Sequence, residues 1–462
     1  METVANIVET VNSILWNNIL IYALLGVGIL YTVILRVPQI SKIGPGFKQT
    51  FGGLFSKEKQ EKVEGEMTSF QALSTAIAAQ VGTGNLAGVA TAISAGGPGA
   101  VFWMWMSAIF GMATNFGEAV LAQKYSETID GEKTGGPAYY LAKGVKSKFL
   151  AGFFAVSIIL ALGFVGSMVQ SNSISEAVNS AFGVNKAIVG VGTAIIVGLI
   201  LVGGMKRIAS FAELVVPIMA GFYILGSLVI LVKFRSDLGW AIKSIFVGAF
   251  NQQALLGGAL GVTVKQAVRL GVARGLFSNE AGMGSTPHAH AVANVKHPAQ
   301  QGMTAMVGVV IDTGVVCTAT ALINIVTKAN QITVPQIVNG VTEQVGINGI
   351  AMTQEAFKAG LGSFGLSFIA VSLFFFALTT IVGWYFFGEA NIKYLFGPKA
   401  IKFYRVAVLG FIVLGSFLKV DLVWELADMF NGLMVIPNVI GLVILAPQAS
   451  RILKDYNENF LG

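Results

Sequence analysis

Long apolar segments, separated by short polar stretches, run along almost the whole chain. A helix needs about 20 mainly apolar residues to cross a bilayer, and most of these segments approach that length. The pattern therefore predicts an all-α polytopic membrane protein with eleven transmembrane helices. The predicted spans are 13–35, 69–95, 99–124, 149–180, 187–205, 211–232, 264–292, 301–327, 363–391, 403–418 and 423–447. Two shorter segments, 238–256 and 351–360, are predicted to be surface helices.

Composition narrows the class of protein further. Only 11% of the 462 residues are charged and 54% are hydrophobic, with 56 glycines and a mean hydropathy of +0.73. Soluble domains carry roughly 25% charged residues, so a nucleic-acid binder and a secreted disulfide scaffold are excluded. The single cysteine, Cys317, has no partner for an intramolecular disulfide.

The distribution of basic residues predicts an orientation in the cell membrane. With the amino terminus outside, twenty of the 30 Lys and Arg residues fall on the cytoplasmic side, in line with the positive-inside rule. Eleven spans then place the carboxyl terminus in the cytoplasm. The first twelve residues contain no Lys or Arg and do not resemble a secretory signal peptide, so we expect the first span to be retained.

Two predicted spans contain polar, glycine-rich clusters near mid-membrane, at 80–85 and 277–284. Such residues suit unwound segments that line a cavity, because exposed backbone has no water partner inside lipid. Each broken span opens a set of five, which predicts two inverted five-helix repeats preceded by one extra helix. The expected divisions are 1–66 (extra helix and cytoplasmic loop), 67–236 (first repeat), 237–263 (outer connection), 264–448 (second repeat) and 449–462 (cytoplasmic tail).

Broken helices expose ends that can bind both a zwitterion and a cation. Free backbone N–H groups at one end favour a carboxylate, and free C=O groups at the other favour a cation. Gly82 and Gly84 let an anion approach the backbone, while Thr83, Asn85 and Ser278 offer neutral oxygens for a hard cation such as sodium. The alternative is that the glycines only allow close helix packing. Packing does not, however, require Gln, Asn and Glu in the same clusters.

Three further residues inside the predicted spans are candidates with two interpretations each. Asp312 is a functional candidate because an intramembrane carboxylate is costly; it either neutralises a cation or proton or pairs with a donor on a neighbouring helix. Glu280 either accepts backbone N–H bonds within the unwound segment or binds an ion. Phe277 either walls a small apolar pocket or serves only helix packing.

A membrane-embedded enzyme is the hypothesis from another class. Its best support would be a metal site at His288 and His290, but residues two apart on a helix point to different faces and no Cys or acidic cluster lies nearby in sequence. We therefore expect no metal beyond a coupling cation. Glu118 and Glu389 are expected to have structural roles near the ends of spans or between helices.

The run Gly96–Gly111 resembles the signature of the alanine or glycine:cation symporter family, and segments 80–85 and 275–285 match the same family. The resemblance implies a secondary active transporter that imports alanine or glycine with sodium by alternating access. Proton coupling is the alternative, and a channel is a more distant one. It also implies the neurotransmitter:sodium symporter-like fold of the APC superfamily. We expect no cofactor besides the coupling ion, no nucleic acid and no obligate protein partner.

The site residues follow from the two clusters and from analogy with that fold. The expected substrate-binding residues are Gln80, Gly82, Thr83, Gly84, Gln170, Phe277, Ser278 and Asn279. The expected cation-binding residues are Ala78, Val81, Asn85, Ser278, Asp312, Thr379 and Thr380. Thr379 and Thr380 rest on the resemblance, which implies that their hydroxyls face backbone carbonyls near Ala78 and Val81. Gln170 either contacts the substrate or makes an interhelical hydrogen bond.

Overall fold

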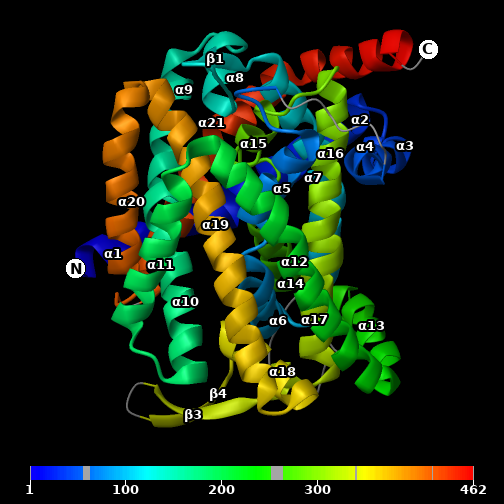
Figure 1. The fold of residues 1–462 in the computed structure, drawn as a ribbon. Coiled ribbons are helices and arrows are strands. Elements are labelled where there is room, and N and C mark those ends of the chain that lie inside the picture. Colours follow the sequence, from blue (N-terminus) through cyan, green and yellow to red (C-terminus); the bar gives the residue numbers. More distant parts are fainter. Residues whose placement is uncertain (1, 56–62, 251–263, 339–340, 419, 461–462) are drawn as a thin grey trace.

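The computed structural model of the chain is mostly helical and describes residues 2–55, 63–250, 264–338, 341–418 and 420–460 (Figure 1). Five of the described helical segments are long and apolar enough to cross a membrane: Lys148–Phe182, Gly204–Lys233, Pro298–Val326, Phe364–Phe396 and Val423–Phe460. A sixth candidate is a bent pair, Ser69–Gln80 and Gly84–Gly96, whose halves meet at 53°. Together these segments suit a protein that passes several times through a membrane.

The described helices run in chain order as follows. The first part contains α1 (Glu2–Ile14), α2 (Leu20–Ile34), α3 (Pro38–Ser41), α4 (Ile43–Phe55), α5 (Ser69–Gln80), α6 (Val89–Gly96), α7 (Gly99–Lys124), α8 (Pro137–Lys143), α9 (Lys148–Ile158), α10 (Ser167–Phe182), α11 (Lys186–Leu201) and α12 (Gly204–Lys233). The second part contains α13 (Arg235–Phe250), α14 (Val264–Asn279), α15 (Pro287–Ala291), α16 (Pro298–Val309), α17 (Thr318–Val326), α18 (Gly349–Leu361), α19 (Phe364–Phe396), α20 (Ile401–Gly415) and α21 (Val420–Asp455).

Two antiparallel hairpins lie at opposite ends of the molecule (Figure 1). Strands β1 (Glu127–Ile129) and β2 (Glu132–Thr134) pair with Glu127 opposite Thr134. Strands β3 (Thr333–Val338) and β4 (Val341–Gly346) pair with Thr333 opposite Gly346. The β1–β2 hairpin lies at the same end as the C-terminus, which gives the two ends of the helical body distinct markers.

Helices continue beyond several predicted boundaries. The region 36–66, predicted as a loop, contains α3 and α4, and the predicted tail 449–462 is helical over its described part, to Phe460. The prediction marked where apolar residues stop, but a helix can leave the membrane and continue until a capping or breaking residue ends it. The predicted surface helices 238–256 and 351–360 correspond to α13 and α18, while residues 251–263 lie outside the described part.

One π-helical stretch, Leu15–Ile19, joins α1 and α2. Three more lie in the middle of described helices: Gly84–Gly88 between α5 and α6, Ile159–Gly166 between α9 and α10, and Val310–Cys317 between α16 and α17. Such stretches are rare in helices and often occur at functional sites. All three lie beside or within the segments that meet at the candidate site described below.

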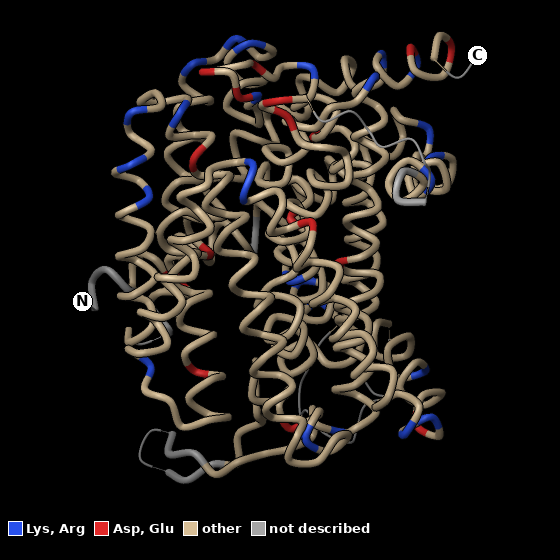
Figure 2. Tube along the Cα trace, in the orientation of Figure 1, with Lys and Arg blue, Asp and Glu red and all other residues tan. Residues whose placement is uncertain are grey.

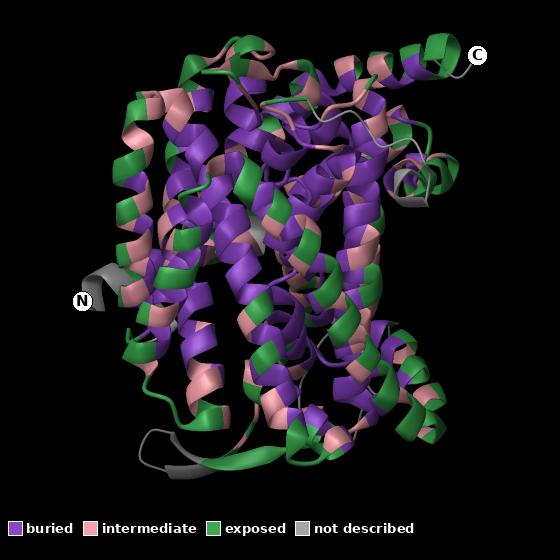
Figure 3. Cartoon of the chain, in the orientation of Figure 1, coloured by how far each residue is buried: buried purple, intermediate pink, exposed green. Residues whose placement is uncertain are grey.

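The surface agrees with a protein surrounded by lipid. Figure 3 shows buried residues through the centre of the helical body and exposed ones on the outer helices. Large apolar side chains are among the exposed residues, including Leu225 on α12 (67% exposed) and Phe403 on α20 (80% exposed). Figure 2 shows many of the Lys and Arg residues at the end that carries β1–β2 and the C-terminus. An apolar waist with charges near the ends is the pattern that a bilayer requires.

Candidate functional site

The first broken helix, α5, begins at a capping box and ends beside a glycine. The Thr68 hydroxyl accepts a hydrogen bond from Gln71 N, and the Gln71 side chain accepts one from Thr68 N. At the other end, Gly82 N donates to Asn85 Oδ1 (2.9 Å) before helical structure resumes. A Cβ atom on Gly82 would lie 2.5 Å from Thr380 Oγ1, so only glycine allows α19 to approach this closely.

The second broken helix, α14, ends in a tight segment that is held by a carboxylate from another helix. Glu280, Gly282 and Gly284 all have positive φ angles, of 56°, 82° and 83°. Glu118 on α7 is fully buried and accepts hydrogen bonds from Gly282 N and Gly284 N, each at 2.9 Å. Asn438 on α21 donates to the same carboxylate at 2.7 Å. Glu118 therefore satisfies backbone donors that the unwound segment leaves free.

The Glu280 carboxylate contacts two side chains, rather than the backbone N–H groups that the first interpretation assigned to it. Its carboxylate accepts hydrogen bonds from Trp384 Nε1 (2.7 Å) and Ser285 Oγ (2.5 Å) rather than from backbone N–H groups. Its positive φ is unusual for a residue with a side chain and costs conformational energy. The two side-chain bonds hold the residue in that conformation and link the break to α19.

Asp312 lies in the π-helical stretch Val310–Cys317 and reaches both breaks. Its Oδ1 accepts a hydrogen bond from Asn85 Nδ2 (2.5 Å), and its Oδ2 accepts one from Ser278 Oγ (2.9 Å) and one from Thr313 Oγ1 (2.8 Å). The side chain is fully buried, and none of the salt bridges formed by the described residues involves it. A buried carboxylate that only neutral donors surround is costly unless it binds a cation or a proton.

The two breaks also contact each other directly. Gln80 Nε2 donates to the backbone carbonyl of Asn279 (2.6 Å), and Asn279 Nδ2 donates to Thr313 Oγ1 (3.2 Å). The bond to a carbonyl sets the orientation of the Gln80 amide, because only its nitrogen can donate there. Gln80 Oε1 is then a buried acceptor without a hydrogen-bond partner among the described residues. Such an acceptor suits a donor group of a ligand.

Gln170 on α10 joins the first break through a pair of hydrogen bonds. Its Nε2 donates to Thr83 Oγ1 (3.1 Å), and its Oε1 accepts from Thr83 N (3.4 Å). Gln170 therefore lies beside the backbone at Gly82 and Thr83. This position allows both the interhelical bond and a contact with the substrate. The Phe277 ring lies beside the same break, with Cδ1 3.4 Å from a Cβ built on Gly84.

The two threonines on α19 point in different directions. Thr380 Oγ1 lies 3.1 Å from Ala78 O and 3.4 Å from Val81 O, the carbonyls at the end of α5. Thr379 Oγ1 instead contacts Met219 Sδ (3.4 Å) and Phe376 O (2.9 Å). Only Thr380 therefore faces the carbonyl ends that the resemblance assigned to both. Ala78, Val81 and Thr380 provide three oxygens, the donor type that a hard cation prefers.

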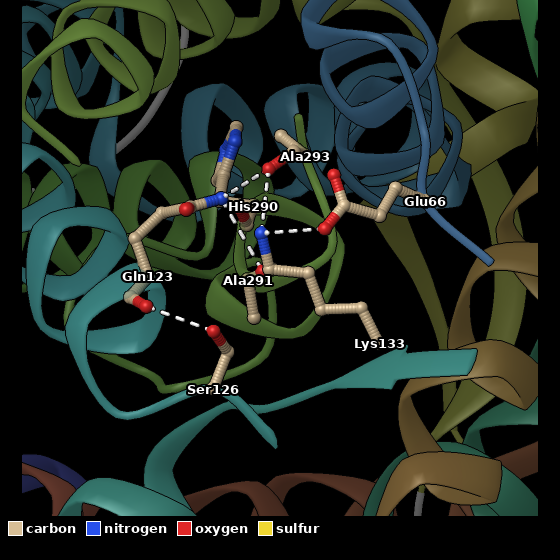
Figure 4. A network of polar contacts seen from close by, with 7 residues as sticks. All are labelled: Glu66, Gln123, Ser126, Lys133, His290, Ala291 and Ala293. Carbon is tan, nitrogen blue, oxygen red and sulfur yellow. Dashed lines mark hydrogen bonds and ion pairs between the residues drawn. The ribbon is translucent and has the colours of Figure 1, made fainter. Parts of the chain in front are cut away.

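A polar network joins the two broken helices at the end that carries β1–β2 (Figure 4). Lys133 Nζ donates to Ala293 O (3.1 Å) and pairs with Glu66 Oε1 (3.4 Å). Gln123 Nε2 donates to the carbonyls of His290 (2.5 Å) and Ala293 (2.9 Å). The chain before α5 and the chain after α15 are thereby held side by side.

The buried histidines are engaged in hydrogen bonds. His288 Nδ1 lies 2.7 Å from Ser285 O and His288 Nε2 lies 2.8 Å from Asn391 Nδ2, while His290 Nδ1 lies 2.7 Å from Gln301 Nε2. Within the described ranges, no group of three His, Cys, Asp or Glu side chains is placed to hold a metal ion. His288 and His290 therefore each have hydrogen-bond partners within the protein.

Comparison with known proteins identifies what the chain resembles as a whole. Residues 1–460 match the model of the sodium:alanine symporter family. The chain is 43% identical to the sodium/alanine symporter AgcS of Methanococcus maripaludis, over 98% of this chain and 97% of that one. It is 42% identical to the putative sodium/proton-dependent alanine carrier protein YrbD of Bacillus subtilis, over 98% and 92%. In fold it resembles MhsT crystallised with L-phenylalanine, with a TM-score of 0.56, 12% identity and coverage of 85% of this chain and 99% of that one.

Proposed function

The chain belongs to the sodium:alanine symporter family, and from that premise we propose that it imports alanine or glycine together with sodium. Membership confirms the resemblance carried by Gly96–Gly111 and makes the chain a multi-pass, cation-coupled amino acid symporter rather than an enzyme. The choice of substrate and of cation is our proposal, as is the architecture of eleven spans with two inverted five-helix repeats, an external N-terminus and a cytoplasmic C-terminus.

The observation that carries the proposal is the position of Asp312 between the two breaks. One carboxylate accepts hydrogen bonds from Asn85, beside the first break, and from Ser278, beside the second. A sodium ion at this carboxylate would offset its buried charge, and movement of either broken helix would change the coordination. This coupling between ion binding and helix position is what a symporter needs.

The substrate is assigned to the neighbouring unwound backbone. Gly82 and Gly84 let a carboxylate approach the backbone, where the Gly82 N–H would exchange its bond to Asn85 Oδ1 for one to the substrate. The unpaired Gln80 Oε1 can accept a hydrogen bond from the ammonium group. Gln170, Ser278 and Asn279 complete the polar lining, and Phe277 provides an apolar wall. Ala78, Val81 and Thr380 form a second oxygen-rich position suited to a cation.

Proton coupling is the second candidate, and Asp312 also motivates it. A fully buried carboxylate with neutral partners can release its electrostatic cost by binding a proton instead of sodium. One named relative is described as sodium/proton-dependent. The two candidates differ in which ion gradient drives accumulation of the substrate.

Uptake into proteoliposomes tests both candidates. Purified protein is reconstituted, and accumulation of labelled alanine and glycine is followed under an inward sodium gradient or an inward proton gradient at equal membrane potential. We expect accumulation with sodium and none with protons alone. Accumulation driven only by protons would replace sodium with the proton at Asp312, and no accumulation under either gradient would refute alanine or glycine symport.

A further inference from the structure

A pocket of about 230 Å³ lies at the end of the molecule that carries β1–β2. It forms where the hairpin, the start of α12, the end of α19 and the start of α20 meet, and five charged residues are part of its lining: Asp130, Glu132, Glu389, Lys393 and Arg405. Glu389 is nine residues beyond Thr380, roughly 13 Å along α19, so the pocket is separate from the candidate site. Pockets for drug-sized molecules measure roughly 300–1,000 Å³, so this one suits a smaller ligand.

One carboxylate oxygen in the pocket has no donor. Lys393 Nζ donates to Glu132 Oε2 (2.6 Å) and lies 3.3 Å from Glu389 Oε1. The other oxygen, Glu389 Oε2, is buried and has no hydrogen-bond partner within the described residues. The whole Glu389 side chain is only 5% exposed. A buried carboxylate oxygen without a donor costs free energy, so a donor group from a bound ligand would stabilise this position. An ammonium group is one such donor.

A guanidinium group in the same pocket has unused donors. Arg405 Nε donates to the Tyr385 hydroxyl (3.4 Å), and its two terminal nitrogens form no hydrogen bond or ion pair within the described part of the chain. A guanidinium fork binds a carboxylate through two parallel hydrogen bonds. The pocket therefore presents one acceptor for a cationic group and one fork for an anionic group.

We propose that this pocket is a second binding site, which takes the zwitterion of a small amino acid. The ammonium group donates to Glu389 Oε2, and the carboxylate accepts from the terminal nitrogens of Arg405. The inference rests on the proposed function, which places this end in the cytoplasm and makes a small amino acid the molecule that accumulates there. Because the pocket joins β1–β2, α12, α19 and α20, an amino acid bound in it holds these elements together and slows import as the internal concentration rises.

Equilibrium binding of labelled alanine to the purified full-length protein, in sodium-containing detergent solution, tests the site. We expect two molecules bound per wild-type chain, one in Arg405→Gln and one in Gly82→Ala, whose added methyl group collides with Thr380 Oγ1 and disrupts the candidate transport site. The double variant has both sites impaired. The component that survives in Gly82→Ala is expected to weaken at least tenfold when Arg405→Gln is added. Glu389→Gln has the same effect, and Arg405→Gln decides alone if Glu389→Gln does not fold.

Competition and a charge control separate the zwitterion from simpler ligands. Propionate and ethylamine carry one of the two charges each, and neither is expected to displace alanine from Gly82→Ala at concentrations where glycine does. Lys402→Gln removes an exposed positive charge at the same end without altering the pocket lining and is expected to bind two molecules. Wild-type binding in Arg405→Gln, displacement by propionate alone, or no binding to folded wild-type protein would each overturn the second site.

The transport measurement keeps this inference distinct from the proposed function. In proteoliposomes preloaded with unlabelled alanine, net sodium-driven uptake is expected to fall at least twofold for wild-type protein and not for Arg405→Gln. Uptake without any preloading is expected to be the same in both. Equal inhibition of both proteins would overturn the regulatory role, whereas loss of uptake in every condition would count against the proposed function itself.

Discussion

The carboxylate of Glu118 accepts a hydrogen bond at 2.9 Å from the backbone N–H of Gly282, and this bond joins an unbroken helix to the unwound part of a broken one. The second oxygen of Glu118 accepts an equivalent bond from Gly284. Both amides lie in a buried segment, where a backbone donor needs a partner within the protein. The shape of the second break therefore depends on a side chain from α7, more than 160 residues earlier in the chain.

Replacing Glu118 with alanine is expected to destabilise the protein. Two buried backbone donors lose their acceptor, and each such loss costs about 1–3 kcal/mol. Thermal unfolding in detergent should show a midpoint several degrees lower, together with loss of alanine uptake. Glu176→Gln is the control, because Glu176 forms a partly exposed ion pair with Lys186, and such pairs contribute little. Equal unfolding midpoints for Glu118→Ala and wild type would contradict a stabilising role of Glu118 at the second break.

Replacing Asp312 with asparagine tests the charge at the junction of the two breaks. The substitution keeps the side-chain volume and one acceptor oxygen but removes the negative charge that offsets a bound cation. We expect the apparent affinity for sodium in uptake to fall by roughly tenfold or more, which corresponds to about 1.4 kcal/mol or more. Asp237→Asn on α13 is the matched control. An unchanged sodium dependence would exclude Asp312 from the cation site.

The adjacent pair Thr379 and Thr380 offers a comparison within one helix. Thr380→Val removes the hydroxyl that faces Ala78 O and Val81 O, while Thr379→Val removes one that contacts Met219 and Phe376 O. Sodium titrations of uptake are expected to show roughly tenfold weaker apparent affinity for Thr380→Val, about 1.4 kcal/mol, and little change for Thr379→Val. The reverse order would mean that α19 presents its other face to the ion.

Gly82→Ala tests the close approach at the first break. The added methyl group would meet Thr380 Oγ1 at 2.5 Å and Gln170 Oε1 at 3.4 Å, so it pushes apart residues that the candidate site needs together. We expect uptake at a fixed alanine concentration to be almost abolished while the protein remains folded. In Gly88→Ala, the new Cβ has no neighbouring atom within 4 Å, and uptake should stay close to wild type. Similar activity in both variants would place the substrate elsewhere.

Much of the helical layout could be predicted from the sequence because its signals are local. Apolar length and Gly/Pro punctuation led to α7 at Gly99–Lys124, and the clusters at 80–85 and 277–284 overlap the breaks after α5 and α14. Helix ends outside the apolar segments were predicted less well, as in α21, because hydropathy does not report where a helix stops in water.

The site could be predicted only as a set of residues. Asn85, Ser278 and Asp312 were all candidates, but their convergence on one carboxylate is a property of three helices packed together. Glu118 was expected to be structural, and nothing near it in the sequence indicates Gly282 and Gly284 as its partners. The one indication of its importance in the sequence was a carboxylate inside a mainly apolar span.

The sequence by itself determined that this chain is a helical membrane protein with two interrupted helices, and its motifs resemble those of one transporter family, because hydrophobicity, glycine content and local motifs are properties of neighbouring residues. Only the tertiary structure decided that Thr380 rather than Thr379 faces the α5 carbonyls, and that Glu389 and Arg405 share a pocket. Neighbouring residues on a helix point about 100° apart. Which of them meets a distant partner therefore depends on how each helix is rotated and packed against the others.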